Sequence, residues 1–162
     1  MTKWAERLAA AFRNEARPAA EAIVNFDGFD QLDKQSALAA FAGKTRDEVA
    51  ALVGAGPTGI QGLWGIEDLQ VLEPAALRYY VEPFLRHLLS RAFDIEDDFS
   101  YFLAYHLAEA VRRRGPEVFT ADQRVAVAEM AADRARQIEG EDDWPAAHRA
   151  HYERLAQLVR GA

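Results

Sequence analysis

The apolar residues of this chain recur at the three- and four-residue spacing of amphipathic α-helices. The densest stripe lies between Leu72 and Leu89. Its members are Leu77, Tyr80, Val81, Phe84, Leu85, Leu88 and Leu89. Pro74 is expected to start this helix, because a proline in the first turn loses no intrahelical hydrogen bond. Pro83 lies inside the stripe and predicts a kink or a break, since it has no N–H to donate.

Similar spacing, together with capping boxes at Thr45 and Thr120, predicts further helices along the chain. They are expected near residues 4–12, 19–26, 32–41, 46–53, 99–114, 121–138 and 145–159. No segment alternates apolar and polar residues in the way a half-buried strand does. The Gly-rich stretch at 54–65 is expected to form a loop. The sequence therefore predicts one all-α domain over residues 1–162, a bundle of about six to eight helices.

Composition excludes several classes of function. The chain has 162 residues, no cysteine and a formal net charge of −7. Without cysteine there is no disulfide framework, thiolate metal site or cysteine nucleophile. The negative charge disfavours binding to the nucleic-acid backbone. No uninterrupted apolar segment has the length of a signal peptide core or a membrane span, so we expect a cytoplasmic protein with neither a membrane nor a nucleic acid as partner.

A glycine motif offers an alternative function. Gly54, Gly56 and Gly59 match the G-x-G-x-x-G fingerprint of dinucleotide sites, and Glu73 stands where a ribose-binding acid would follow. That fingerprint works only between a strand and a helix, whereas a capped helical pattern precedes it here. A nucleotide- or flavin-binding protein using Gly54–Gly59 is therefore the alternative, and no cofactor is expected in the leading interpretation.

The histidines are expected to be structural. His148 and His151 lie one helical turn apart and would suit a metal, but no H-E-x-x-H motif or second ligand helix accompanies them. A solvated or half-buried pair is the favoured interpretation. His106 lies on an apolar stripe, which favours a hydrogen-bonded core histidine over a general base, because no nucleophile lies near it in sequence. No catalytic or metal-binding residue is assigned.

The leading interpretation is a non-enzymatic protein that acts by protein–protein interaction. Aromatic residues off the main stripes and the acidic clusters at helix ends are the candidate partner surface, although such clusters also simply solvate helix ends. The candidate residues are Tyr79, Glu82, Tyr101, Tyr105, Asp97, Asp98, Glu141, Asp142 and Asp143. The unidentified protein partner of such a surface would be basic.

Several phrases of the sequence resemble a family of small bacterial proteins of unknown function. They are LEPAALRYYVEPFL at 72–85, Phe41-Ala42-Gly43-Lys44, and the late cap Phe119-Thr120-Ala121-Asp122-Gln123. The chain departs from the family's phrase in having Val81-Glu82 before Pro83. The resemblance implies a helical domain without an established activity. By analogy, such proteins are similar to immunity or accessory proteins.

Overall fold

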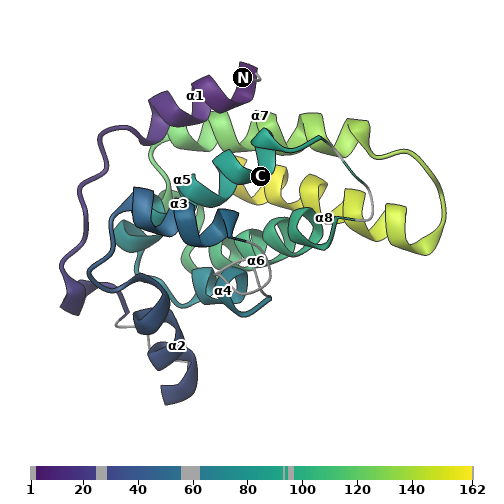
Figure 1. The fold of residues 1–162 in the computed structure, drawn as a ribbon. Helices are drawn as coiled ribbons and strands as arrows, with labels where there is room; N and C mark the ends of the chain where they lie inside the picture. Colours follow the sequence, from purple (N-terminus) through teal and green to yellow (C-terminus); the bar gives the residue numbers. More distant parts are fainter. Residues whose placement is uncertain (1–2, 25–28, 56–62, 93, 95–96, 162) are drawn as a thin grey trace.

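The computed structural model describes residues 3–24, 29–55, 63–92, 94 and 97–161. These residues form eight α-helices and three 3₁₀ turns, with no strand among them. The α-helices are α1 (Lys3–Phe12), α2 (Gln31–Phe41), α3 (Arg46–Gly54), α4 (Leu63–Glu67), α5 (Pro74–Ser90), α6 (Asp98–Arg114), α7 (Ala121–Gln137) and α8 (Asp143–Arg160). The 3₁₀ turns are η1 (Ala20–Ala22), η2 (Asp68–Gln70) and η3 (Pro116–Val118). The predicted all-α class is confirmed (Figure 1).

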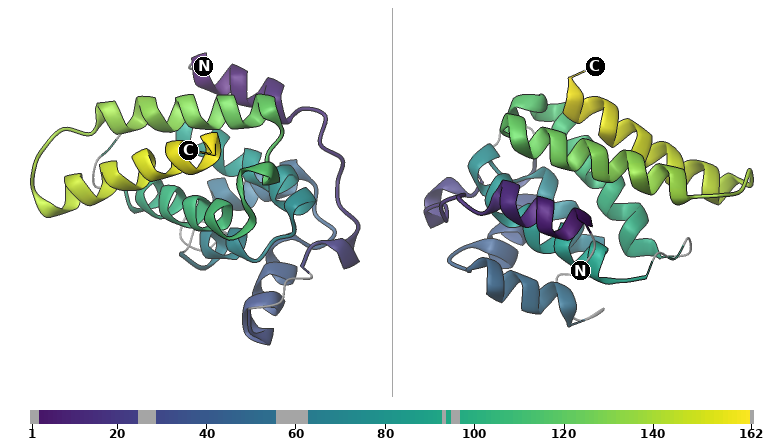
Figure 2. Two further views of the ribbon diagram at one scale, coloured as in Figure 1. Left: turned by 180° about the vertical axis from the view of Figure 1, so that it is seen from behind. Right: turned by 90° about the horizontal axis from the view of Figure 1, so that it is seen from above.

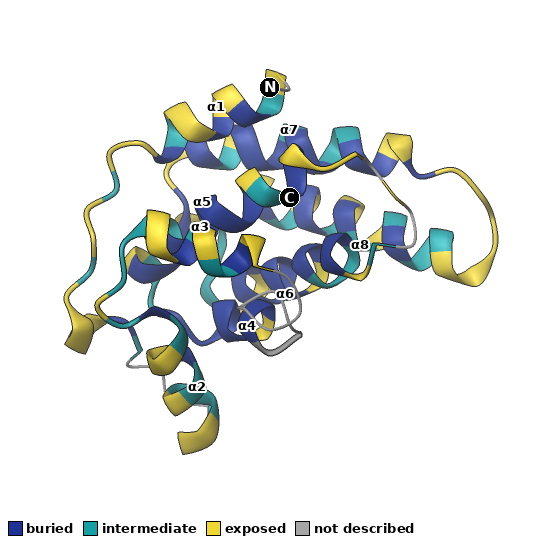
Figure 3. Ribbon diagram, viewed as in Figure 1, coloured by how far each residue is buried: buried dark blue, intermediate teal, exposed yellow. Residues whose placement is uncertain are grey.

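Helix α5 is the centre of the fold. Eleven of its 17 residues are buried, and they lie around the whole circumference of the helix rather than on one stripe. Helices α1, α3 and α6 pack against it, and Figure 3 shows the helix enclosed by its neighbours along most of its length. A helix that is apolar and buried on several sides is typical of the core of a helical domain.

The enclosure of α5 corrects two sequence predictions. Tyr79 and Glu82 lie off the main stripe and were expected at the surface, but they are only 9% and 6% exposed. Arg46 covers the ring of Tyr79 at 4.6 Å, and Arg86 pairs with Glu82 at 3.4 Å. The prediction failed because neighbouring helices cover α5 on more than the side that its stripe defines. Neither residue therefore belongs to an exposed partner surface.

Pro83 does not break the helix. Helix α5 runs without interruption from Pro74 to Ser90 with Pro83 inside it. Proline removes one intrahelical hydrogen bond, but dense packing of the surrounding buried residues maintains the helix. Of the predicted kink or break, the break is therefore wrong, and the kink stays a prediction.

The C-terminal half forms a second layer of long helices. Helix α7 packs between α1 and α8, and α8 packs in turn against α6 (Figures 1 and 2). Helix α7 presents small side chains to this layer, and Ala128, Ala131 and Ala135 are buried. Small residues let helix axes approach closely, which explains why α7 and α8 form such an extensive contact.

Other local predictions have mixed outcomes. Both capping boxes are present, at Thr45 and at Thr120. The helix expected over 19–26 is reduced, within the described residues, to the single turn η1. The loop expected over 54–65 is wrong at both ends, since Gly54 ends α3 and α4 begins at Leu63, and residues 56–62 lie outside the described residues. None of the described helices is long and apolar enough to cross a membrane.

The hydroxyl group of Tyr80 fixes the end of α2 onto α5. It lies 2.8 Å from the carbonyl oxygen of Phe41 and 2.8 Å from that of Lys44. The rings of Tyr80 and Phe41 also pack, with centroids 5.0 Å apart. One buried hydroxyl thus contacts the last carbonyl of α2, which has no intrahelical donor, and a carbonyl of the turn that follows it.

Replacing Tyr80 with phenylalanine tests this contact. We expect Tyr80→Phe to lower the free energy of unfolding by about 1–2 kcal/mol, because the carbonyls of Phe41 and Lys44 would lose their shared hydroxyl partner, and Phe41 would keep only the backbone N–H of Lys44. Denaturant unfolding followed by circular dichroism measures the change. The matched control is Tyr105→Phe, which removes a phenolic hydroxyl group from a residue that is 36% exposed. Equal effects of the two substitutions would contradict the assignment.

Candidate functional site

Helices α6 and α8 lie side by side and start at the same end of the molecule. Tyr101, near the start of α6, stacks on Trp144, near the start of α8, with centroids 4.4 Å apart and planes at 16°. Farther along both helices, Arg154 pairs with Glu109 at 2.8 Å. The two helices are therefore parallel, and their N-terminal ends and acidic first turns are brought together (Figure 1).

Four side chains form a partly exposed aromatic patch at this end: Tyr101, Tyr105, Trp144 and His151. The ring of His151 lies 4.7 Å from that of Tyr101 and 5.1 Å from that of Tyr105. Trp144 is 38% exposed and Tyr105 is 36% exposed, while Tyr101 and His151 are half-buried. Burial, and then the charge of Arg154, lowers the pKa of His151, which favours its neutral form.

Exposed carboxylates precede two rings of the aromatic patch along the chain. Asp98 lies one turn before Tyr101, and Asp142 and Asp143 directly precede Trp144. We call the exposed acids Asp98, Glu141, Asp142 and Asp143 the acidic rim. Within the described part of the chain, none of these four makes an ion pair.

Asp97 has a structural role instead. Its carboxylate accepts a hydrogen bond from the backbone N–H of Phe99 at 3.2 Å and pairs with Arg91 at 3.1 Å. A carboxylate in this position satisfies a free N–H of the first helical turn and complements the helix dipole. Of the nine residues predicted for a partner surface, the structure therefore brings together Tyr101, Tyr105 and the four acids of the rim.

A buried polar network lies beneath the patch. The hydroxyl oxygen of Ser100 is 3.1 Å from Nε2 of His148 and 2.7 Å from the hydroxyl of Tyr152. The Tyr152 hydroxyl donates to the carbonyl oxygen of Ser100 at 3.2 Å. All three side chains are at most 2% exposed, and burial raises the pKa of Tyr152 to about 12. The network joins α6 to α8 through hydrogen bonds that satisfy its buried groups.

The Ser100–His148 pair has the residue types of a nucleophile and its base. A substrate cannot reach it, because both side chains are enclosed. Sequence reasoning missed the pair, since 48 residues separate its members. The only local signal is a serine at a buried position of α6, and that signal does not identify a partner.

The three C-terminal histidines lie in different surroundings. His106 is 8% exposed and its ring is hydrogen-bonded to the Gln70 side chain, which confirms the predicted core histidine. Burial lowers the pKa of His106 to about 4. His148 is fully buried, contrary to the solvated or half-buried pair that was expected, and His151 is half-buried. The described residues contain no group of three or more histidine and acidic side chains arranged to hold a metal ion.

A small polar cavity of about 320 Å³ lies near η2, between α2 and α6. Its lining includes Ser36, Asp68, Gln70 and Arg113. Asp68 is 6% exposed and accepts a hydrogen bond from the Ser36 hydroxyl at 3.0 Å. Burial raises the pKa of Asp68 to about 6, because the charged form is poorly solvated. No pattern in the sequence indicates that this acid is buried.

Most of the glycine motif at Gly54–Gly59 falls outside the described residues. The residues before it form α3, which ends at Gly54. The dinucleotide site that such a motif marks requires a strand in that position. The alternative function at this motif stays a prediction, and its described flank lacks the expected strand.

Comparison of the chain with family models, with curated proteins and with solved structures finds no match. The resemblance to small bacterial proteins therefore stays a prediction.

The buried network beneath the patch makes a testable prediction. We expect Ser100→Ala to lower the free energy of unfolding by about 1–3 kcal/mol, because it removes the one buried hydroxyl that is hydrogen-bonded to both His148 Nε2 and the Tyr152 hydroxyl. Ser90→Ala removes a serine hydroxyl from an exposed position of α5 and should change stability by less than about 0.5 kcal/mol. Denaturant unfolding measures both variants. If their effects are equal, the network does not stabilise the α6–α8 contact.

The raised pKa of Asp68 makes a second prediction. The folded state keeps this proton up to about pH 6, whereas the unfolded state loses it near 3.8. Folding stability therefore falls as pH rises through this window. We expect Asp68→Asn to raise the free energy of unfolding at pH 7 by up to about 3 kcal/mol, and the gain to vanish below about pH 4.

Unfolding measured from pH 4 to pH 8 on Asp68→Asn and on the wild type tests this. The lowered pKa of His106 makes folding stability rise with pH, which is opposite to the effect of Asp68. This contribution is the same in both proteins and cancels in the difference between their stabilities. Glu21→Gln, at an exposed carboxylate, is the control. A difference that stays constant over this pH range would show that Asp68 is not desolvated.

Proposed function

We propose that this protein is a non-enzymatic binding protein that takes a basic segment of a protein partner on its aromatic patch and acidic rim. One observation carries the proposal: the stacked Tyr101–Trp144 pair joins two parallel helix starts, so that exposed rings and exposed carboxylates occupy one end of the molecule. Exposed rings alone, or exposed carboxylates alone, would not distinguish this end from an ordinary surface.

The chemistry of the surface supports a cationic partner. Indole and phenol rings attract arginine and lysine through their negative faces. Carboxylates beside the rings add charge-assisted hydrogen bonds, for which the guanidinium group of arginine is well shaped. The chain's formal net charge of −7 would also accelerate the approach of a basic partner. Tryptophan, tyrosine and arginine are the residues that most often dominate binding at protein interfaces.

The resemblance to small bacterial proteins supports an extension of this proposal. In that setting the binding protein would act in the cytoplasm, in an immunity-like or accessory role. The partner in such a role would be a protein with an exposed basic segment.

Site-specific photocrosslinking tests the proposal in cells. A photoreactive benzoylphenylalanine at position 105 should capture a discrete protein whose crosslinked peptide is rich in arginine or lysine. The same group at position 32 is the control, because Leu32 is 73% exposed and lies on α2, away from the aromatic patch. Identical products from both positions, or none from position 105, would contradict the proposal.

The captured partner then allows a quantitative measurement. Trp144→Ala and the double variant Asp142→Asn/Asp143→Asn should each weaken its binding about tenfold or more, which corresponds to the loss of a hot-spot side chain or of paired charges. Leu32→Ala should leave binding unchanged. Circular dichroism confirms that each variant is folded.

A further inference from the structure

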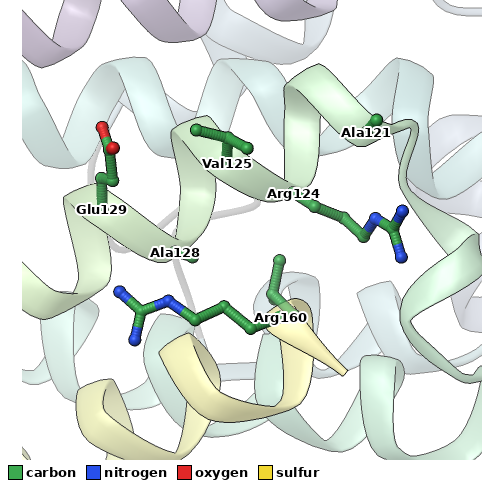
Figure 4. Close-up of a pocket in the computed structure, with 7 residues that line it drawn as sticks. Ala121, Arg124, Val125, Ala128, Glu129 and Arg160 are labelled. Atoms are coloured by element: carbon green, nitrogen blue, oxygen red, sulfur yellow. The ribbon is translucent and has the colours of Figure 1, made fainter. Parts of the chain in front are cut away.

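A groove between α7 and α8 is positively charged. It holds about 390 Å³ between the start of α7 and the end of α8. Val125, Ala128 and Val159 give it apolar walls, and Val125 is 47% exposed. Figure 4 shows Arg124 entering from α7 and Arg160 from α8, with their guanidinium groups at opposite ends of the groove.

The groove continues in two directions from Arg160. One adjoining hollow follows α7 and α8 towards Arg136 and Arg149, and another reaches α1 at Lys3 and Arg7. Together these hollows are lined by six cationic side chains and three carboxylates. The whole chain has 19 lysines and arginines against 26 acids. The local balance of charge is thus the reverse of the overall balance.

Two of the five arginines among these cations are free to meet a ligand, and the sixth cation, Lys3, lies over the ring of Trp4. Arg7 is paired with Glu129, Arg136 pairs with Asp133 at 3.0 Å, and Arg149 donates to backbone carbonyls. Arg124 and Arg160, in contrast, make no side-chain hydrogen bond or ion pair with any residue that the structure describes. The two arginines without partners are the two that flank the apolar walls.

We propose that this groove binds an acidic amphipathic α-helix of a partner protein. Such a helix would place a narrow apolar stripe against Val125 and Ala128, and carboxylates on either side of the stripe against Arg124 and Arg160. Helix α7 has 17 residues and is therefore about 25 Å long, enough to receive about four turns of a partner helix.

Charge complementarity and the apolar walls select this occupant. A nucleic-acid backbone would meet the same arginines, but it offers no apolar surface to cover the exposed side chain of Val125. The groove also shares no residue with the aromatic patch or the acidic rim. Its partner is thus distinct from the basic partner proposed there, and failure of one proposal leaves the other standing.

A peptide titration on the full-length protein tests the inference. The probe is a fluorescently labelled amphipathic peptide of about four helical turns, with glutamates flanking an alanine–leucine stripe. Its two controls are the same peptide with lysine in place of glutamate and a scrambled peptide of identical composition. We expect the glutamate peptide alone to bind, and increasing salt to weaken it.

Matched variants locate the site. Arg124→Gln/Arg160→Gln should weaken binding of the glutamate peptide about tenfold, the combined effect of two partly exposed charge contacts. Arg13→Gln/Arg17→Gln removes the same charge from exposed positions outside the groove and should leave binding unchanged. Backbone and arginine Nε–H resonances of α7 and α8 should shift on titration.

Four results would overturn the inference. They are equal binding of the lysine or scrambled peptide, no binding of the glutamate peptide, and equal loss in the two double variants. The fourth is a groove-dependent ligand of another class. Tight binding of a DNA duplex, or self-association in sedimentation, that Arg124→Gln/Arg160→Gln abolishes would assign the groove to nucleic acid or to a second copy of this chain.

Discussion

The enclosure of α5 is the constraint on which the rest of the structure depends. Eleven of its residues are buried, and each large apolar side chain among them contributes about 1.5–3 kcal/mol on transfer from water. Helices α1, α3 and α6 pack against α5, and this packing positions them. The charged group of Glu82 is buried with them, so Arg86 must stay beside it, because an unpaired buried carboxylate is strongly destabilising.

Sequence periodicity predicted the long helices because each buries at least one continuous apolar stripe. The capping boxes were predicted because they depend only on residues close together in the sequence. Periodicity failed where burial is decided by distant neighbours. Tyr79 lies off the stripe of α5, yet Arg46 of α3 covers its ring. Glu82 is also buried, although the arginine that pairs with it, Arg86, belongs to the same helix. The segment 19–26 has the composition of a helix, but the residues described there form only one turn. Isolated segments of this length are marginal as helices unless packing stabilises an apolar face.

The candidate surface was predictable in part, for the same reason. Its acids and tyrosines stand at helix starts and can be recognised locally. The parallel arrangement of α6 and α8 has no local signal in the sequence. It arises because α7, which follows α6 in the chain and packs against α8, carries the chain back before α8 begins. Only this arrangement stacks Tyr101 on Trp144, a residue that sequence reasoning did not select. The Ser100–His148–Tyr152 network beneath them ties the two helices together, so the exposed rings are held in place before any partner arrives.

Helix α8 carries both proposed surfaces and explains why they differ in charge. Acids at the start of a helix and bases at its end complement the helix dipole, so local stability alone favours Asp142 and Asp143 at one end and Arg160 at the other. Trp144 and Arg160 are 16 positions apart, which places them roughly 24 Å apart along the axis. That separation exceeds the Debye length of about 8 Å at physiological salt several-fold. Each proposed surface is therefore largely screened from the charge of the other, so that the two proposals, of a basic partner at one end of α8 and an acidic one at the other, are compatible.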